Sequence, residues 1–431
     1  MQHNFEGLDR PGGTSRIGLL RPLRARDFRF LWAGMTTSLV GDGIFLVAIA
    51  WIAFSLWNTP AALSIVGIAM TVPTIACLLV GGVISDRFDR RRVLFCADLG
   101  RGVVVGVLAL LAATHVLDFA MLTVLVAAYG VGAAFFTPAF ESIVPTIVDP
   151  KDLAQANALD QFVRPIALRL IGPALGGWLI ALVGVGAAFA IDSASFAVSA
   201  VTVLFLRRSL AVTAPPSSAM AALGDGWRFV RGHVWLWGTL LSAAVAYLAF
   251  LGPTETLVPY MVKNVLHGSP SDLGLVFAAG GIGAVGAAVV VGQRGQPRRD
   301  ITWMYLCWTV ATLAVVGYGL AQTIPQLMLA CLLFNALEAA GTIMWSTIKQ
   351  RHVPAGLLGR ISSLDWLLSI SLLPLSFAIT GPVADVIGVR ATLVGAGLIG
   401  AAATFVALFI PGMRDVEGVY RPLPAAPAPS S

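Results

Sequence analysis

Long apolar segments alternate with short polar ones along the whole chain. Twelve of these segments have about the 20 mainly apolar residues that a helix needs to cross a bilayer. The first is too long for the core of a signal peptide and has no clear small-residue cleavage site, so we expect it to be retained. The pattern therefore predicts an all-α integral membrane protein with twelve transmembrane helices, at roughly 28–55, 61–84, 93–114, 119–146, 157–182, 186–206, 234–261, 272–292, 302–321, 324–348, 361–384 and 389–411.

The basic residues divide unequally between the two sides of these spans. If the N-terminus is cytoplasmic, the outer loops receive only Lys263 and Arg390, and the inner connections and tails receive the other lysines and arginines outside the spans. This asymmetry follows the positive-inside rule and predicts a multi-pass plasma-membrane protein with both termini in the cytoplasm. An odd number of spans would invert the second half, which supports the count of twelve.

The composition also indicates a lipid environment. Charged residues make up 12% of the chain and hydrophobic residues 57%, whereas about a quarter of the residues in a globular domain are charged. The net charge of +6 does not gather on one soluble face, so we expect no nucleic acid partner. The four cysteines stand singly in apolar segments, and the five histidines lack metal-ligand spacing. We therefore expect no disulfide framework, no metal and no cofactor.

The longest inner connection, at about 207–233, divides the chain into two halves of six spans. The halves share weak similarity at matching positions, as in transporters built from parallel six-span repeats. This organisation predicts a disordered cytoplasmic tail at 1–20, an N-terminal six-helix bundle at 21–206, a cytoplasmic linker at 207–233, a C-terminal six-helix bundle at 234–412 and a disordered cytoplasmic tail at 413–431.

Two short motifs carry a family resemblance. The stretch GGVISDRFDRRRVLF places six charges in residues 86–92, and it resembles the G-x-x-x-D-R-x-x-R-R signature between spans 2 and 3 of the major facilitator superfamily. In span 5, Gly172-Pro173-Ala-Leu-Gly176-Gly177 resembles the G-P-x-x-G-G motif of members that export by antiport. Val163 replaces a glycine that this motif often has nine positions earlier. Over about 20–415 the chain is similar to the drug- and siderophore-exporter branch, in FRFLWAGMTTSLVGDGIFLVAIAW, KDLAQANAL and GWRFVRGHVWLW.

The resemblance implies the major facilitator fold and a role for each motif. Asp86 would accept hydrogen bonds from the N-terminus of span 11 and lock the inner gate when the cavity faces out, while Gly82 allows close helix approach. The basic residues of the signature would hold the loop in the cytoplasm; these are Arg87, Arg90 and Arg91. A loop that is arginine-rich for topology alone is the alternative. Pro173 would bend span 5, and the motif's glycines would pack it tightly, although Gly and Pro are common in membrane helices anyway.

Charged residues within the spans point to a transport site, since each costs about 2.5–3.5 kcal/mol near the bilayer centre. We expect four of them to face a wet central cavity or one another: Asp42 in span 1, Arg169 in span 5, Glu255 in the outer third of span 7 and Glu338 in span 10. Glu141 lies towards the inner end of span 4 and belongs either to the gate or to the cavity.

Other charged residues have simpler interpretations. Asp98 and Arg101 stand three apart, and Asp160 and Arg164 stand four apart. Each pair therefore shares a helical face and is expected to form an internal salt bridge. Two further aspartates lie within about two turns of a span end and are expected at the membrane edge; they are Asp192 and Asp365.

Together these features predict a secondary active transporter that exports a small amphipathic drug, antibiotic or siderophore by proton antiport with alternating access. Its partners would be the small-molecule substrate, protons and the lipid bilayer, and it would act as a monomer. The first choice for the proton-exchanging carboxylate is Asp42 and the second is Glu338. Aromatic side chains would either bind the substrate or pack against lipid and neighbouring helices; they are Trp51, Phe135, Phe136, Tyr247 and Trp345.

Several alternatives remain at this stage. A nutrient facilitator or importer and a lipid flippase would share the fold. A membrane enzyme, a receptor or an ATP-driven pump is disfavoured, because the chain has no H-E-x-x-H, G-x-S-x-G or G-x-x-x-x-G-K-[ST] motif and no soluble domain able to bind ATP. We therefore expect no enzymatic activity.

Overall fold

The computed structural model describes residues 18–149, 152–207, 227–294, 297–354, 357–358, 361–362, 364–365, 367 and 371–417. Regular secondary structure in this part of the chain is helical throughout. Eleven of the described helices are long and apolar enough to cross a membrane, and the shorter apolar helix Leu373–Ile387 covers part of the twelfth predicted span. The prediction of an all-α integral membrane fold is confirmed.

Two groups of helices follow one another along the chain. The first group contains a short 3-10 helix and the helices that follow it, namely η1 (Gly18–Arg24), α1 (Arg26–Leu56), α2 (Pro60–Arg87), α3 (Arg90–Ala113), α4 (Phe119–Ile147), α5 (Leu153–Pro165), η3 (Ile166–Ile171), α6 (Gly172–Val183) and α7 (Val185–Leu204). The second contains α9 (Val234–Tyr260), η4 (Met261–Val265), α10 (Pro270–Arg294), α11 (Asp300–Leu320), α12 (Ile324–His352), α14 (Leu373–Ile387) and α15 (Val389–Ala407). Most of the predicted linker, at 208–226, lies outside the described residues.

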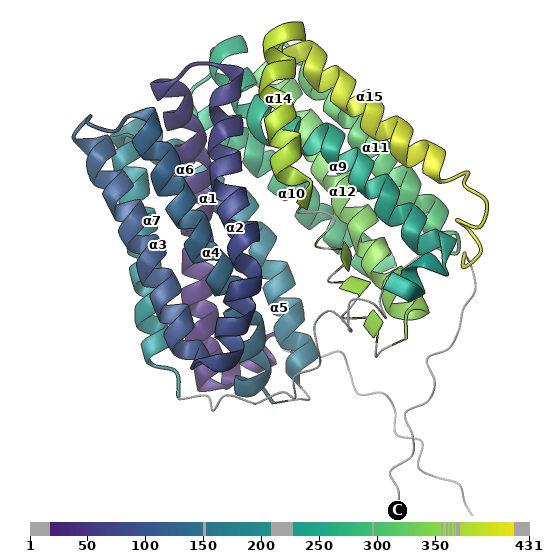
Figure 1. The fold of residues 1–431 in the computed structure, drawn as a ribbon, viewed down its shortest axis with the longest axis horizontal. Helices are drawn as coiled ribbons and strands as arrows, with labels where there is room; N and C mark the ends of the chain where they lie inside the picture. The colour runs from purple at the N-terminus through teal and green to yellow at the C-terminus, as the bar shows by residue number, and fades with distance from the viewer. Residues whose placement is uncertain are drawn as a thin grey trace, which may run out of the picture.

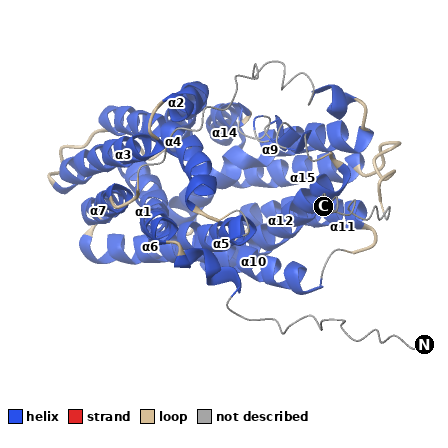
Figure 2. Cartoon of the chain, turned by 90° about the horizontal axis from the view of Figure 1, so that it is seen from below, coloured by secondary structure: helices blue, strands red, loops and turns tan. Residues whose placement is uncertain are grey.

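The two groups stand side by side, converging at one end and diverging at the other (Figures 1 and 2). Between them, α2 packs against α14 and α6 packs against α10. One hydrophobic core, which includes Phe45 and Val258, is shared by both groups. Two further cores are separate: one around Phe28 belongs to the first group, and one around Trp235 belongs to the second. The molecule is therefore joined at the converging end and split at the other.

A matching turn occurs near the end of each group. Gly184 joins α6 to α7 with φ of +89°, and Gly388 joins α14 to α15 with φ of +86°. This left-handed conformation strains residues with a side chain, so glycine is needed at both turns. Equivalent glycine turns at equivalent positions agree with the internal repeat that the sequence indicates.

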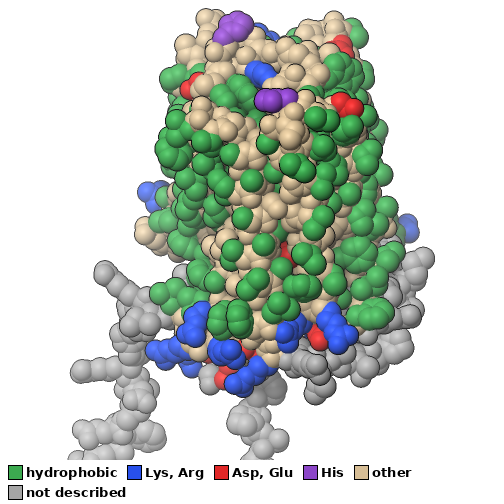
Figure 3. All heavy atoms as spheres, turned by 90° about the vertical axis from the view of Figure 1, so that its left-hand side faces the viewer, with side chains coloured by type: hydrophobic (Ala, Val, Ile, Leu, Met, Phe, Trp, Pro, Cys, Tyr) green, Lys and Arg blue, Asp and Glu red, His purple; other side chains and the backbone are tan. Residues whose placement is uncertain are grey.

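The outer surface is suited to a bilayer. On the face shown in Figure 3, apolar side chains cover the middle of the molecule, and lysine and arginine side chains gather at the end where the helices diverge. We call this the basic end. Large apolar side chains are exposed on the helices, for example Val124 on α4 at 68% and Leu110 on α3 at 63%. Such exposure would be unfavourable in water and is expected against lipid. The chain is a multi-span membrane protein.

Candidate transport site

A cavity of about 290 Å³ lies between the two groups of helices. Its apolar wall includes Phe45 and Ile49 from α1, Leu63 from α2, and Phe334 and Phe377 from α12 and α14. Several of the lining residues belong to the core that both groups share, so the converging end closes the cavity. None of the five aromatic residues considered as substrate contacts lines this cavity, which uses other aromatic rings. They pack against the hydrophobic cores instead, which is the alternative that the sequence left open.

Arg169 enters the cavity from the wide π-helical turn η3. Its Nη1 donates a 3.2 Å hydrogen bond to Oδ1 of Asn335 on α12, and the side-chain nitrogen of Asn335 donates to the carbonyl of Cys331 at 2.9 Å. The backbone of η3 also approaches α10 closely: a Cβ built on Gly281 would stand 2.6 Å from the carbonyl oxygen of Arg169. A glycine is needed there because the two backbones leave no room for a side chain.

Glu255 lines the same cavity from α9, in the other group of helices, where its side chain is exposed. Within the described ranges, neither Glu255 nor Arg169 forms a salt bridge. The cavity thus offers one cationic and one anionic group, each free to meet a ligand, within an otherwise mostly apolar wall. Charges that line a cavity inside a membrane protein mark a pathway for a substrate or an ion.

Asp42 lies within the first group of helices, away from the cavity lining. Its Oδ1 accepts a 2.6 Å hydrogen bond from the hydroxyl group of Tyr129 on α4. The ring of Tyr129 stacks on Phe45, with centroids 4.8 Å apart and an interplanar angle of 15°. Because Phe45 lines the cavity, a single aromatic contact separates Asp42's hydrogen-bonded partner from the cavity wall.

A buried ion pair lies in the same bundle. Nη2 of Arg101 is 2.5 Å from Oδ1 of Asp98, and Ser199 on α7 donates to Oδ2 of Asp98 at 2.6 Å. The guanidinium group is also placed over the rings of Phe136 and Phe196, 4.4 Å from each centroid. These contacts satisfy a charge that would otherwise be costly to bury. The predicted pairing of Asp98 with Arg101 is confirmed, as is that of Asp160 with Arg164 at 3.4 Å.

The other two predicted site residues lie away from the cavity. Glu338 on α12 is partly buried, and its Oε1 accepts a 2.9 Å hydrogen bond from Thr342 one turn later. Glu141 on α4 is exposed. The cavity lining therefore brings together Arg169 and Glu255 and leaves Asp42, Glu338 and Glu141 in other surroundings.

The motif of span 5 forms two helix contacts. Gly172, Pro173, Gly176 and Gly177 are all buried. Gly172 and Gly176 face α1, and a Cβ built on Gly177 would stand 2.5 Å from the carbonyl oxygen of Pro270 at the start of α10. The π-helical turn η3 ends immediately before Gly172. The motif therefore holds α6 against both its own group and the opposite one.

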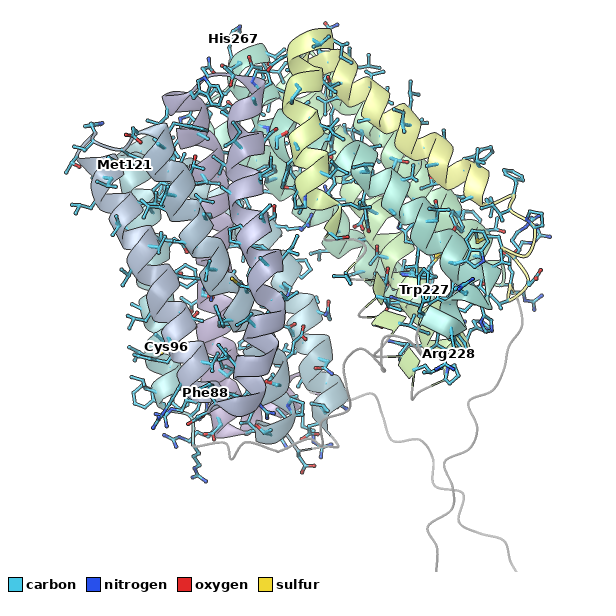
Figure 4. The ribbon with its side chains drawn as sticks, in the orientation of Figure 1. Phe88, Cys96, Met121, Trp227, Arg228 and His267 are labelled. Atoms are coloured by element: carbon cyan, nitrogen blue, oxygen red, sulfur yellow. The ribbon has the colours of Figure 1, made fainter. Side chains whose placement is uncertain are left out.

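The signature between spans 2 and 3 lies at the basic end. Phe88, in the middle of this signature, is labelled there in Figure 4. Arg91 donates to the carbonyl oxygens of Val203, at 3.1 Å, and Leu204, both at the end of α7. Arg90 is buried at 9% exposure. Gly82 and the side chains of Asp86 and Arg87 lie outside the described residues. Where it is described, the signature thus bonds within its own group of helices.

Comparison with known proteins identifies the family. The sequence profile described as "transmembrane secretion effector" matches residues 17–421. The chain belongs to this family. It is a transporter of the major facilitator superfamily, which confirms the resemblance drawn from the two motifs.

Two relatives of this transporter carry the names of exporters. The chain is 28% identical over 418 residues to the multidrug efflux pump Tap of Mycolicibacterium fortuitum, covering 91% of this chain and 97% of that protein. It is 26% identical over 343 residues to the enterobactin exporter EntS of Citrobacter koseri, covering 78% and 80%. A bacterial homologue of the iron transporter ferroportin, solved in an inward-facing state, shares the fold with a TM-score of 0.68 and 16% identity over 89% of this chain and 99% of that structure.

The sequence interpretation missed several residues of the site. Asp192 was expected at the membrane edge, but its side chain is fully buried inside the first group of helices. Lys263 was assigned to an outer loop, but it lies in η4 and bonds to α1 across the converging end. Tyr129 and Asn335 carry no charge, so no pattern of charges could have indicated them. The only indication of them in the sequence was the presence of Asp42 and Arg169 inside spans, because a charge there requires a polar neighbour.

Proposed function

We propose that this transporter exports small amphipathic compounds in exchange for protons, by alternating access of the cavity between its two groups of helices. The observation that carries the proposal is a mostly apolar cavity, closed at one end, whose lining includes Arg169 and Glu255, neither of which forms a salt bridge among the described residues. The positive-inside rule places the basic end in the cytoplasm. The helices diverge at that end, so the cavity faces the compartment from which an exporter loads its substrate.

The cavity favours an amphipathic compound of modest size. Its wall combines aromatic rings with two charges of opposite sign. The rings would contact the apolar body of a substrate, and one of the charges would bind its polar or charged group. The volume of about 290 Å³ is at the lower limit of the roughly 300–1,000 Å³ usual for small-molecule sites. The names of the relatives Tap and EntS, a multidrug pump and a siderophore exporter, support export of such compounds.

Proton exchange is assigned first to Asp42 and second to Glu338. Both are acidic groups in membrane spans, and Asp42 lies one hydrogen bond and one ring contact from the cavity wall. Moving one charge through 100 mV supplies about 2.3 kcal/mol, which corresponds to about a fiftyfold gradient of exported compound. The signature at the basic end would form the inner gate when the cavity faces outward, with Asp86 meeting span 11.

Export assays in everted membrane vesicles test the proposal. Vesicles containing the transporter are energised and offered a panel of antibiotics, cationic dyes and siderophores, with and without an uncoupler. We expect accumulation inside the vesicles that the uncoupler abolishes. Accumulation that ignores the uncoupler would contradict proton antiport, and uptake only in the opposite orientation would indicate an importer.

The coupling residues are tested in the same vesicles. The double variant Asp42→Asn with Glu338→Gln should lose the dependence of export on the proton gradient. Asp160→Asn, which removes a carboxylate paired with Arg164 from the same group of helices as Asp42, is the matched control and should retain it. Unchanged proton dependence in the double variant would reject both assignments.

A further inference from the structure

Asp192 on α7 is fully buried, with 0% of its surface exposed, yet its carboxyl group has few partners. The hydroxyl oxygen of Ser195 lies 3.3 Å from Oδ1 but only 2.7 Å from the main-chain oxygen of Asp192, to which it donates. No described residue bonds to Oδ2. A buried carboxylate without donors is far less stable than one in water, so this group requires a proton or a cation.

Asp42 follows directly in the sequence after the residue of α1 that this group meets. A Cβ built on Gly41 would stand 2.4 Å from Oδ1 of Asp192, so α7 presses that carboxyl group against α1 at the position next to Asp42. Asp42 has one donor, the hydroxyl group of Tyr129. If both carboxyl groups were ionised, they would repel each other within the first group of helices.

The charges that surround the two carboxyl groups do not balance them. On α3, Arg101 also acts on both, but its ion pair is with Asp98, which adds a third carboxylate to the cluster. On α5, Arg164 acts on Asp42 more weakly and is itself paired with Asp160. With every acid ionised, three carboxylates, of which Asp98 and Asp192 are fully buried, would share one buried guanidinium. One proton on Asp42 or Asp192 would halve the net negative charge of this cluster.

Neither carboxyl group lines the substrate cavity. The connection between them and the cavity runs through Tyr129, which donates to Asp42 and stacks on the cavity residue Phe45. Helix α1 thus contributes one residue to the acidic pair and several to the cavity wall. A change of charge at the pair can be transmitted to the cavity by movement of these shared elements.

We infer that Asp42 and Asp192 hold one proton between them, and that this is the proton exchanged for substrate, bound at a site apart from the substrate. The inference rests on the proposed function and adds Asp192 as a second member of the proton site. When the proton leaves, two adjacent buried carboxylates repel each other, and the strain is relieved by displacement of α1 against α7. Proton and substrate then act on each other through the position of α1, without competing for one group.

The shared proton is tested by infrared difference spectroscopy of the purified transporter during a pH titration, with no ligand added. The carbonyl stretch of protonated carboxyl groups is followed in the wild type, in Asp42→Asn, in Asp192→Asn and in the double variant. We expect one band that Asp192→Asn removes and that the double variant reduces no further, and we expect Asp42→Asn to change the pH dependence of this band because the neighbouring charge is then absent. Separate bands, each lost in only one variant, would overturn the inference. Asp160→Asn is the control that leaves the band in place.

A transport measurement separates this inference from the proposed function. In proteoliposomes with a pH gradient of one unit, one coupled proton supports about a tenfold gradient of a cationic dye. We expect the wild type to build this gradient. With Asp192→Asn, we expect the dye to reach about equal concentrations on the two sides, while the variant still exchanges dye across the membrane. If Asp192→Asn fails to fold, Asp192→Glu replaces it and should restore most of the gradient. A coupled wild type with an equally coupled Asp192→Asn would overturn only the inference; an uncoupled wild type would contradict the proposed function.

Discussion

The ammonium nitrogen of Lys263 lies 2.6 Å from the hydroxyl oxygen of Ser55 and 3.2 Å from the carbonyl oxygen of Trp51. It also lies over the indole ring of Trp51, 4.8 Å from the centroid. These contacts join η4 of the second group to α1 of the first at the converging end. They stabilise the state in which that end is closed.

Replacing Lys263 should favour opening of the converging end. Lys263→Met removes two hydrogen bonds from a charged donor at a half-exposed position, so we expect a loss of about 1 kcal/mol from the closed state and about a fivefold shift in its population. The distance between spin labels at Asn58 and His267, measured by double electron–electron resonance in a cysteine-free background, should acquire a longer component. Figure 4 labels His267 at this end.

Arg390→Met is the control for that experiment. Arg390 also lies near the converging end, but it donates to the carbonyl oxygens of Gly319 and Ala321 within its own group, at 2.8 and 2.7 Å. It should leave the label distance unchanged. An unchanged distribution in Lys263→Met as well would show that the lysine contact has no effect on closure.

The two free charges of the cavity should select substrates by charge. Glu255→Gln removes the anionic group, so we expect export of cationic dyes to fall about tenfold or more, in keeping with about 1.5–3 kcal/mol for a charged hydrogen bond. Arg169→Gln should have the corresponding effect on anionic compounds. Export rates measured with a matched pair of cationic and neutral probes check the prediction. Glu255→Asp should restore cation export, and equal losses for both probes in Glu255→Gln would refute charge selection.

The contact between α6 and α10 should not accept even one methyl group. In Gly177→Ala the new Cβ would meet the carbonyl oxygen of Pro270 at 2.5 Å and Cα of Gly274 at 3.0 Å, both of which are backbone atoms. We expect about 1–3 kcal/mol of destabilisation from overpacking, seen as a lower midpoint of thermal unfolding in detergent. Gly286→Ala is the control, since a Cβ there meets nothing within 4 Å. Equal midpoints for the two variants would contradict the close contact.

Breaking the buried ion pair should destabilise the first group of helices strongly. Arg101→Met leaves the carboxylate of Asp98 buried without its cation, which costs about 3–5 kcal/mol. The pair Asp160–Arg164 is more exposed, with Arg164 at 43%, so Arg164→Met should cost about 0–1 kcal/mol. Thermal unfolding of both variants measures the difference. Adding Asp98→Asn to Arg101→Met should recover part of the loss, and a double variant no more stable than Arg101→Met would rule out the charge explanation.

The sequence could predict the spans, because lipid requires about 20 apolar residues whatever the neighbouring helices are. Salt bridges such as Asp98 with Arg101 were predictable too, because residues three or four apart lie on the same face of a helix. The surroundings of Asp42 and Asp192 were not, since they depend on which faces of α1, α3, α4 and α7 meet. A position two turns from a span end is compatible with both the membrane edge and the bundle interior.

The cavity was predictable only in part. The charges of Arg169 and Glu255 inside spans indicated a polar interior, but the choice of aromatic rings around them depends on helix rotation. The π-helical turn that directs Arg169 also has no pattern of its own in the sequence. Its helix was predicted as one continuous span at 157–182, and the structure divides it into α5, η3 and α6.

That wide turn has a consequence for how the span tolerates change. A π turn holds one residue more than an α turn, and each residue advances an α-helix by about 100°. Deleting one residue within Ile166–Ile171 would convert the π turn into an α turn, so Asp160 and Arg164 would keep their direction relative to Gly172 and Gly177. A deletion in the regular helix on either side would instead rotate the two parts of the span by about 100° relative to each other.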